Sequence, residues 1–134
     1  MKIVNPPGWA PPRGYANGVS ARGRLVFVAG QIGWNGAQQF ESDEFVAQAA
    51  QALANVAAVL RAADALPSHV VRLTWYVVDK REYLASLPAL AASYRAVMGR
   101  HFPAMTAVEV TALIEDRARV EIEATAVVPD AGAG

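Results

Sequence analysis

The sequence predicts an α+β domain in which two helices cover one face of a mainly antiparallel sheet. Strand and helix periodicities follow one another along the chain as strand, helix, strand, helix and two further strands. The chain has 134 residues, 54% of them apolar, which is enough for one continuous core. We therefore expect a single domain over residues 1–134, with an irregular, proline-rich arm at 1–14 and a flexible tail at 129–134.

The first strand and the first helix occupy the N-terminal half. The apolar run 25–29 stops at Gly30, and an uninterrupted run of this kind is typical of a strand buried on both faces. Over 43–63, large apolar residues recur every three or four positions and predict a helix. Polar residues interrupt its most apolar stretch, whereas a membrane span needs about 20 predominantly apolar residues. We expect this helix to pack on the core and the chain to have no membrane partner.

The C-terminal half supplies the remaining elements. Residues 70–78 are rich in β-branched and aromatic side chains and predict a long strand, in which we expect Trp75 and Tyr76 to serve packing. Helical spacing continues over 81–98, although Pro88 should kink that helix or restart it near Ser86. Two alternating runs, 104–113 and 119–128, flank a polar linker and predict a hairpin.

The last run separates two kinds of side chain. Val120, Ile122, Ala124 and Ala126 point one way, and Glu121, Glu123, Thr125 and Val127 the other. In the expected hairpin, this second face also receives Met105, Ala107, Glu109 and Thr111. A face that mixes acids with apolar residues suits a subunit interface with small polar pockets. The alternative is a solvated sheet face.

Composition and missing motifs exclude several functions. Twelve basic residues balance twelve acidic ones, so no overall field attracts nucleic acid or anionic lipid. The chain has no cysteine and no signal-peptide pattern, which fits a cytoplasmic protein. The two histidines stand apart, so we expect no metal site, and no nucleotide-binding or serine-hydrolase motif occurs. Carboxylates and tyrosines remain, and these suit the positioning of water and the movement of protons.

Four motifs, in order from about residue 15 to 128, resemble those of the Rid (reactive intermediate deaminase, or YjgF) family. They are Gly-Tyr at 14–15, Val-Phe-Val-Ala-Gly-Gln-Ile at 26–32, Phe-Pro-Ala with Val-Glu-Val at 102–110, and Val-Glu-Ile-Glu-Ala at 120–124. The resemblance implies a chorismate-mutase-like homotrimer whose sheets line a central barrel, with three clefts between subunits. It also implies hydrolysis of a small-molecule imine or enamine without a cofactor.

The resemblance also assigns site residues. Glu121 and Tyr15 correspond to the pair that orders the attacking water, and the backbone at Gly30 and Gln31 corresponds to the part that holds the substrate. The family's carboxylate-clamping arginine falls on Met105, and a small cysteine-type position falls on Ala107. Ala29 and Ala91 stand where the family has a serine and an asparagine. We interpret the chain as a divergent branch.

These departures shape the expected substrate. A charge-assisted carboxylate contact contributes about 1.5–3 kcal/mol, so losing the arginine disfavours the usual small α-imino acids. We predict a larger or less acidic imine, held by Met105, by Trp34 or by Trp9 of a neighbouring copy. The alternative is a non-catalytic trimer that binds a small molecule. Ribonuclease activity is disfavoured, because the chain is neutral and lacks an aromatic and basic strand pattern.

Overall fold

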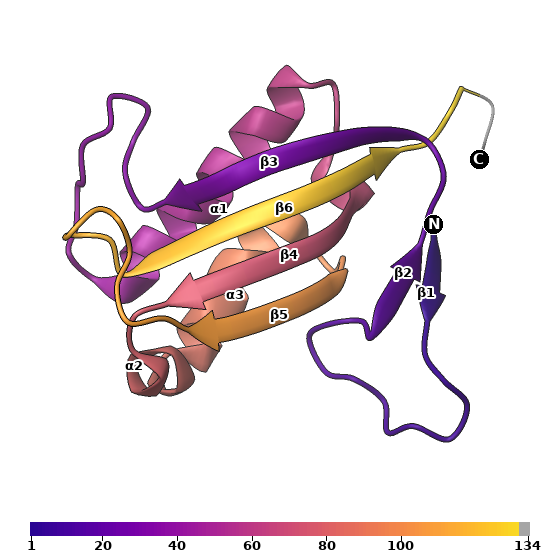
Figure 1. Ribbon diagram of the computed structural model, residues 1–134, viewed down its shortest axis with the longest axis horizontal. Helices are drawn as coiled ribbons and strands as arrows, with labels where there is room; N and C mark the ends of the chain where they lie inside the picture. The colour runs from indigo at the N-terminus through magenta and orange to yellow at the C-terminus, as the bar shows by residue number, and fades with distance from the viewer. Residues whose placement is uncertain (132–134) are drawn as a thin grey trace.

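The computed structural model describes residues 1–131 and has the predicted α+β architecture. Four strands form the main sheet in the order β3-β6-β4-β5, and β1 and β2 form a separate antiparallel pair (Figure 1). The elements are β1 (Lys2–Val4), β2 (Gly18–Ser20), β3 (Arg24–Ile32), α1 (Phe45–Ala62), a 3-10 turn (Pro67–His69), β4 (Val70–Val77), α2 (Lys80–Ala85), α3 (Leu87–Met98), β5 (Ala104–Glu109) and β6 (Val120–Val128).

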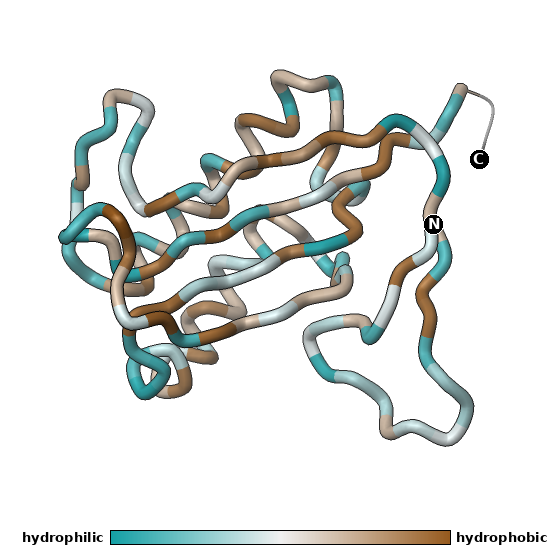
Figure 2. The backbone as a smooth tube through the Cα atoms, in the orientation of Figure 1, coloured by the Kyte–Doolittle hydropathy of each residue, from teal (hydrophilic) through white to brown (hydrophobic). Residues whose placement is uncertain are grey.

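The domain has two layers, because α1 and α3 lie together on one face of the main sheet (Figure 1). The core lies between these layers, and hydrophobic colour is concentrated along the strands and the helices behind them (Figure 2). Helix α1 has the length and apolarity of a membrane span. It nevertheless buries a stripe against the sheet, as a core helix does: Phe45, Gln48, Ala49, Ala52, Leu53, Val56 and Leu60.

The helix break predicted near Pro88 is present. Helix α2 ends at Ala85 and α3 begins at Leu87, with Pro88 in its first turn. The missing N–H of a proline costs nothing there, because the first N–H groups of a helix have no intrahelical partner. Asp79 caps α2 by accepting from the backbone N–H of Arg81 at 2.9 Å. The chain therefore turns sharply after β4 and returns along the sheet as α3.

The predicted hairpin of the last two strands is wrong. Strand β4 lies between β5 and β6; it pairs antiparallel with β6 and parallel with β5. Each strand does have the expected sequence pattern, but local alternation does not specify which strand becomes the neighbour. The sheet is consequently mixed, with two antiparallel pairings and one parallel pairing.

Two further expectations need correction. Strand β3 is buried on one face only, since Phe27 is 73% exposed and Leu25 is 58% exposed. The arm at 1–14 is not wholly irregular, because Lys2–Val4 pairs with Gly18–Ser20. Of the predicted tail at 129–134, residues 132–134 lie outside the described part of the chain.

Candidate functional site

The face of the sheet away from the helices carries the carboxylates of β6, as the alternation predicts. Val120, Ile122 and Ala126 are fully buried beneath the helices, so Glu121 and Glu123 lie on the opposite face, which we call the open face. Across the ladder, Glu121 pairs with Tyr76 and Glu123 with Thr74. A single chain is therefore enough to give this face its mixed polar and apolar character.

Glu123 already has a partner on the open face. The Tyr76 hydroxyl donates to Glu123 Oε1 at 2.6 Å. This hydrogen bond, together with partial burial and the nearby charges of Glu123 and Glu121, raises the pKa of Tyr76 above its ordinary value of 10.0. Tyr76 thus stays neutral and fixes Glu123, which distinguishes that carboxylate from Glu121.

Glu121 lies against a bulge in β3. The register between β3 and β6 shifts by one residue between Val28 and Gln31, and bulges of this kind bend a strand and re-aim its side chains. A Cβ added at Gly30 would overlap the Glu121 carboxylate. Gln31 steadies the bulge by donating from Nε2 to the carbonyl of Ala29 at 3.0 Å. Glycine at 30 therefore leaves the room that the carboxylate occupies. Three predicted residues, Gly30, Gln31 and Glu121, lie together, and we call them the Glu121 group.

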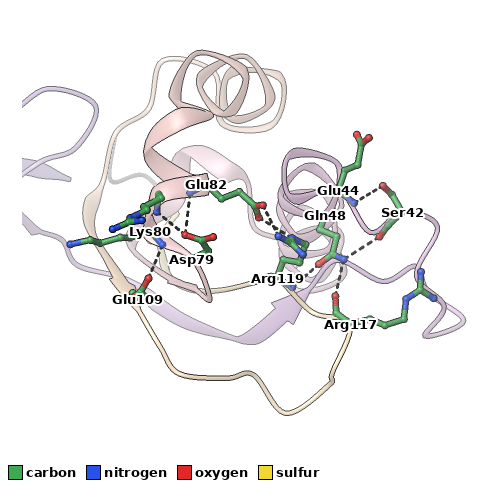
Figure 3. A network of polar contacts seen from close by, with 10 residues as sticks. Ser42, Glu44, Gln48, Asp79, Lys80, Glu82, Glu109, Arg117 and Arg119 are labelled. Atoms are coloured by element: carbon green, nitrogen blue, oxygen red, sulfur yellow. Dashed lines mark hydrogen bonds and ion pairs between the residues drawn. The ribbon is translucent and has the colours of Figure 1, made fainter.

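A polar network anchors the start of β6, just before Glu121 (Figure 3). The buried Gln48 side chain accepts from the backbone N–H of Arg119 at 2.8 Å and donates to the carbonyl of Arg117 at 3.0 Å. Arg119 also makes a two-pronged ion pair with Glu82 of α2. These contacts join the residues before β6 to α1 and α2, so they limit movement of the backbone that carries Glu121.

A pocket of about 370 Å³ lies between α3, β5 and the N-terminal arm, on the helix-covered side of the sheet. Its wall is mainly aromatic and aliphatic and contains no carboxylate. We call this cavity the α3–β5 pocket. It is lined by Arg13, Gly14, Trp75, Tyr83, Leu87, Leu90, Ala91, Tyr94, Arg95, Phe102 and Met105.

The aromatic residues of the α3–β5 pocket are held in fixed positions. Tyr94 stacks on Phe102 with ring centroids 5.5 Å apart, and its hydroxyl donates to the carbonyl of His101. Burial raises the pKa of Tyr94 far above its ordinary value of 10.0. Trp75 packs near Tyr83, and its buried indole N–H finds no acceptor among residues 1–131. The pocket wall is thus a rigid aromatic surface.

Met105 lines this pocket, and so lies on the face opposite to the one predicted. In the β4–β5 ladder Met105 pairs with Leu73 and Ala107 with Trp75, both of which are buried beneath the helices. Glu109 follows the same alternation, and it accepts from the backbone N–H of Lys80 at the start of α2. The error follows from the predicted hairpin, because a wrong neighbour inverts the assignment of every side chain in a strand.

Met105 and Glu121 are therefore separated within one chain. They lie on opposite faces of the sheet, and their pairing partners in β4, Leu73 and Tyr76, are three residues apart, or about 10 Å along a strand. Ala107 is exposed and does not line the pocket. One chain thus holds two separate groups of predicted site residues.

Tyr15 and Trp34 belong to different surroundings. The N–H of Ala16 donates to the carbonyl of Pro103 at 2.9 Å, which fixes Tyr15 beside the start of β5, close to the α3–β5 pocket. Trp34 packs on Phe40 in the loop after β3, with ring centroids 5.8 Å apart. Its carbonyl accepts from Asn55 of α1 at 2.7 Å. In the sequence, Trp34 follows Gln31 of the Glu121 group by three residues. It does not line the pocket that contains Met105.

Several pocket residues were not expected to be functional. The sequence assigns Trp75 to packing and places Phe102 in a Rid-like motif without a role in the site, and no sequence pattern points to Arg13, Tyr83 or Arg95. Alternation in β4 does place Trp75 on the side of Leu73 and Val77, and α3 does present Leu87, Ala91 and Tyr94 at helical spacing. The contribution of the arm is not visible in any local pattern, because it depends on the bridge between Ala16 and Ala104.

Comparison with known proteins identifies the family. The profile of the Endoribonuclease L-PSP family matches residues 8–128. The chain is 34% identical over 116 residues to the 2-iminobutanoate/2-iminopropanoate deaminase of Salmonella typhimurium, covering 84% of this chain and 86% of the relative. A Yersinia pestis structure of the conserved Rid protein family, YyfB, of unknown function, aligns with a TM-score of 0.83 at 36% identity, covering 95% and 98%. The chain belongs to the Rid family.

Because the chain belongs to the Rid family, both groups of residues can be compared with the Rid motifs. A second solved relative, Escherichia coli TdcF with bound serine, aligns with a TM-score of 0.68 at 28% identity, covering 96% of this chain and all of that one. Met105 and Ala91, which stand where the resemblance places an arginine and an asparagine, both line the α3–β5 pocket. Glu121 and Gly30, which match the motifs, lie together at the bulge. Ala29, which stands where the resemblance places a serine, precedes Gly30 at the bulge, so such positions occur at both groups.

Proposed function

We propose that this protein hydrolyses a reactive imine or enamine, and that its site forms between the subunits of a homotrimer. The Glu121 carboxylate, set over Gly30 on an uncovered sheet face, is the observation that carries the proposal. It is a base in the place where the Rid motifs have one, and Tyr76 does not occupy it in the way that it occupies Glu123. Relatives at about 34% identity are named imine deaminases, which supports the reaction class.

The reaction follows from the groups available. Water, oriented by Glu121 with Tyr15, adds to the imine carbon, and its proton passes by way of the carboxylate to the nitrogen. The C–N bond of the resulting carbinolamine then breaks, giving a carbonyl compound and ammonia. No electrons are transferred, and the residues named require no cofactor for this step. The backbone at Gly30 and Gln31 holds the substrate next to the carboxylate.

Assembly from several copies is part of the proposal. Glu121 and the α3–β5 pocket lie on opposite faces of one sheet, so a substrate that fills the pocket cannot reach the Glu121 of the same chain. The exposed Leu25 and Phe27 of β3 extend the open face with apolar area that a second copy would cover. Sedimentation at micromolar concentration should show one species of three chains, and a stable monomer would remove the intersubunit site.

Ammonia release over a panel of aliphatic and aromatic imines tests the reaction. The change Glu121→Gln keeps the size of the side chain and removes its basicity, so kcat should fall by about 100-fold or more. Glu123→Gln is the matched control, because it lies on the same strand and face and can still accept from Tyr76. Equal turnover in parent and Glu121→Gln for every accepted imine would exclude the water-positioning role.

A binding trimer without catalysis is the second candidate. The observation that favours it is the α3–β5 pocket, whose lining has no carboxylate and includes Met105 where the resemblance places the Rid arginine. Such a protein would bind the carbonyl compound or imine tightly and release no ammonia. The same panel separates the two functions.

A further inference from the structure

The α3–β5 pocket combines an apolar cavity with two cations. Stacked Tyr94 and Phe102, together with Trp75, form much of its wall, while Arg13 and Arg95 belong to the same lining. Arg13 comes from the N-terminal arm and Arg95 from the last turn of α3. Both are exposed, and neither makes a hydrogen bond or ion pair of its side chain with residues 1–131. They are available to an anion.

The cavity is too large and too apolar for a small imino acid. A volume of about 370 Å³ falls within the range of sites that enclose small molecules. A methyl or ethyl side chain would leave most of the aromatic wall uncovered. Each methylene group buried there improves binding by about four-fold, so an aromatic or large aliphatic side chain has a substantial advantage. Flat aromatic rings also pack well beside the Tyr94 and Phe102 pair.

The two arginines can take over the task that Met105 cannot perform. A guanidinium binds a carboxylate with two parallel hydrogen bonds, whereas a thioether has no donor. Arg13 is two residues before Tyr15, whose neighbours Gly14 and Ala16 tie the arm to the pocket and to β5. A carboxylate held by Arg13 and Arg95 would therefore place the adjacent imine carbon near Tyr15.

We infer that the substrate is a 2-imino acid with an aromatic or large apolar side chain, which fills the α3–β5 pocket while Arg13 and Arg95 hold its carboxylate. The inference rests on the proposed imine hydrolysis and specifies its substrate class. Water adds to the imine carbon, the C–N bond breaks, and the products are ammonia and the corresponding 2-keto acid. Amino-acid oxidation or a pyridoxal-type reaction on a bulky amino acid is the class of step that supplies such an imine.

Binding of the stable keto-acid product tests the pocket without requiring turnover. Calorimetry should show that the trimer binds phenylpyruvate at least about ten-fold more tightly than pyruvate. Arg13→Gln and Arg95→Gln should each weaken phenylpyruvate by about three- to ten-fold, because the lost contacts are charge-assisted but partly screened. The affinity for phenylacetone, which lacks the carboxylate, should differ by less than about two-fold between the parent and these two variants. Arg61→Gln on α1 removes an equal charge outside the pocket lining and should leave both ligands unaffected.

The outcomes separate this inference from the proposed function. If phenylpyruvate binds no better than pyruvate, or if both arginine variants bind it like the parent, the substrate class is overturned. Hydrolysis of imines regardless of side chain would overturn the substrate class and leave the deaminase function intact. Selective, arginine-dependent binding without ammonia release from the phenylpyruvate imine would support the pocket and contradict the deaminase function.

Discussion

The two groups of site residues differ in their side chains and in the chemistry that they can perform. The Glu121 group, at the bulge between β3 and β6, has a base and lies on the open face, where a hollow of about 390 Å³ is lined in part by Ala29, Arg72 and Glu123. The α3–β5 pocket has an aromatic and aliphatic lining with two cations and no carboxylate, and it contains Met105 and Ala91, where the resemblance leads us to expect an arginine and an asparagine. From this difference we expect water activation to depend on the Glu121 group and substrate selection to depend on the α3–β5 pocket.

The largest effect expected from a small change concerns the Glu121 group. Gly30→Ala should displace the Glu121 carboxylate, because the added methyl group needs the space that its oxygens occupy. A displacement of about 1 Å can reduce kcat about 100-fold, whereas binding of phenylpyruvate, which depends mainly on the α3–β5 pocket, should weaken far less. Steady-state kinetics beside calorimetry would measure both. Gly36→Ala is the control, since no atom lies within 4 Å of a Cβ there.

If Gly30→Ala weakens phenylpyruvate binding as strongly as it reduces kcat, the two groups are not independent. Thermal unfolding should accompany the kinetics. The nearest atoms all belong to the Glu121 side chain, so this side chain can move and little stability should be lost.

A change in the α3–β5 pocket should alter selection and leave water activation in place. Met105→Arg restores a cation at the position of the Rid arginine, so binding of pyruvate should improve by about ten-fold, as one charge-assisted contact allows. Phenylpyruvate should bind less well, because the longer side chain enters the cavity. Ala107→Arg is the matched control: it lies on the same strand and face but outside the pocket lining.

The gain from Met105→Arg should be partial, because Ala29, Ala91 and Ala107 also depart from the motifs and a poorly supported buried cation costs several kcal/mol. A variant that stays folded and trimeric, yet binds neither pyruvate nor a small imino acid better than the parent, would contradict the placement of Met105 in the substrate site.

The sequence predicted local elements well and strand neighbours poorly. The alternation of side chains in β6 correctly predicted that Glu121 and Glu123 lie on the face opposite to Ile122. The position of Pro88 correctly predicted the helix break at Ser86. The pairing of β4 with β5 depends on contacts across the whole domain, and the expected hairpin accordingly placed Met105 on the wrong face. The α3–β5 pocket could not be predicted, because Arg13, Trp75 and Arg95 meet only after the arm bridges to β5.

The smallest effect concerns the rigidity of the pocket wall. Tyr94→Phe retains the stack on Phe102 and removes the hydrogen bond to the carbonyl of His101, which should lower the free energy of unfolding at neutral pH by about 1 kcal/mol. In the parent, the unfolded tyrosine ionises near its ordinary pKa of 10.0, while the folded pKa is raised. The contribution of neutral Tyr94 to the free energy of unfolding should therefore be fully present below pH 10 and should decrease as the pH rises above 10.

Urea denaturation at about pH 7 and about pH 11 would measure this linkage. The free energy of unfolding should decrease less between these two pH values in Tyr94→Phe than in the parent. Part of the decrease should remain in the variant, because Tyr76 and Tyr83 also have raised pKa values. Identical alkaline profiles for the two proteins would show that the Tyr94 hydroxyl is accessible to solvent, which would contradict the buried position of Tyr94 in the pocket wall.

The central claim, that the two groups meet only between chains, can be tested by complementation. Glu121→Gln disables one group, and Ala91→Trp fills the pocket from an exposed position on α3. Each variant alone should be nearly inactive. When both are co-expressed and mixed trimers are purified with two different tags, each mixed trimer should have one site in three that combines two intact groups from neighbouring chains, and ammonia release should recover to about a third of the parent rate. If the mixed trimers never exceed the sum of the separate variants, each site lies within a single chain and the account is wrong.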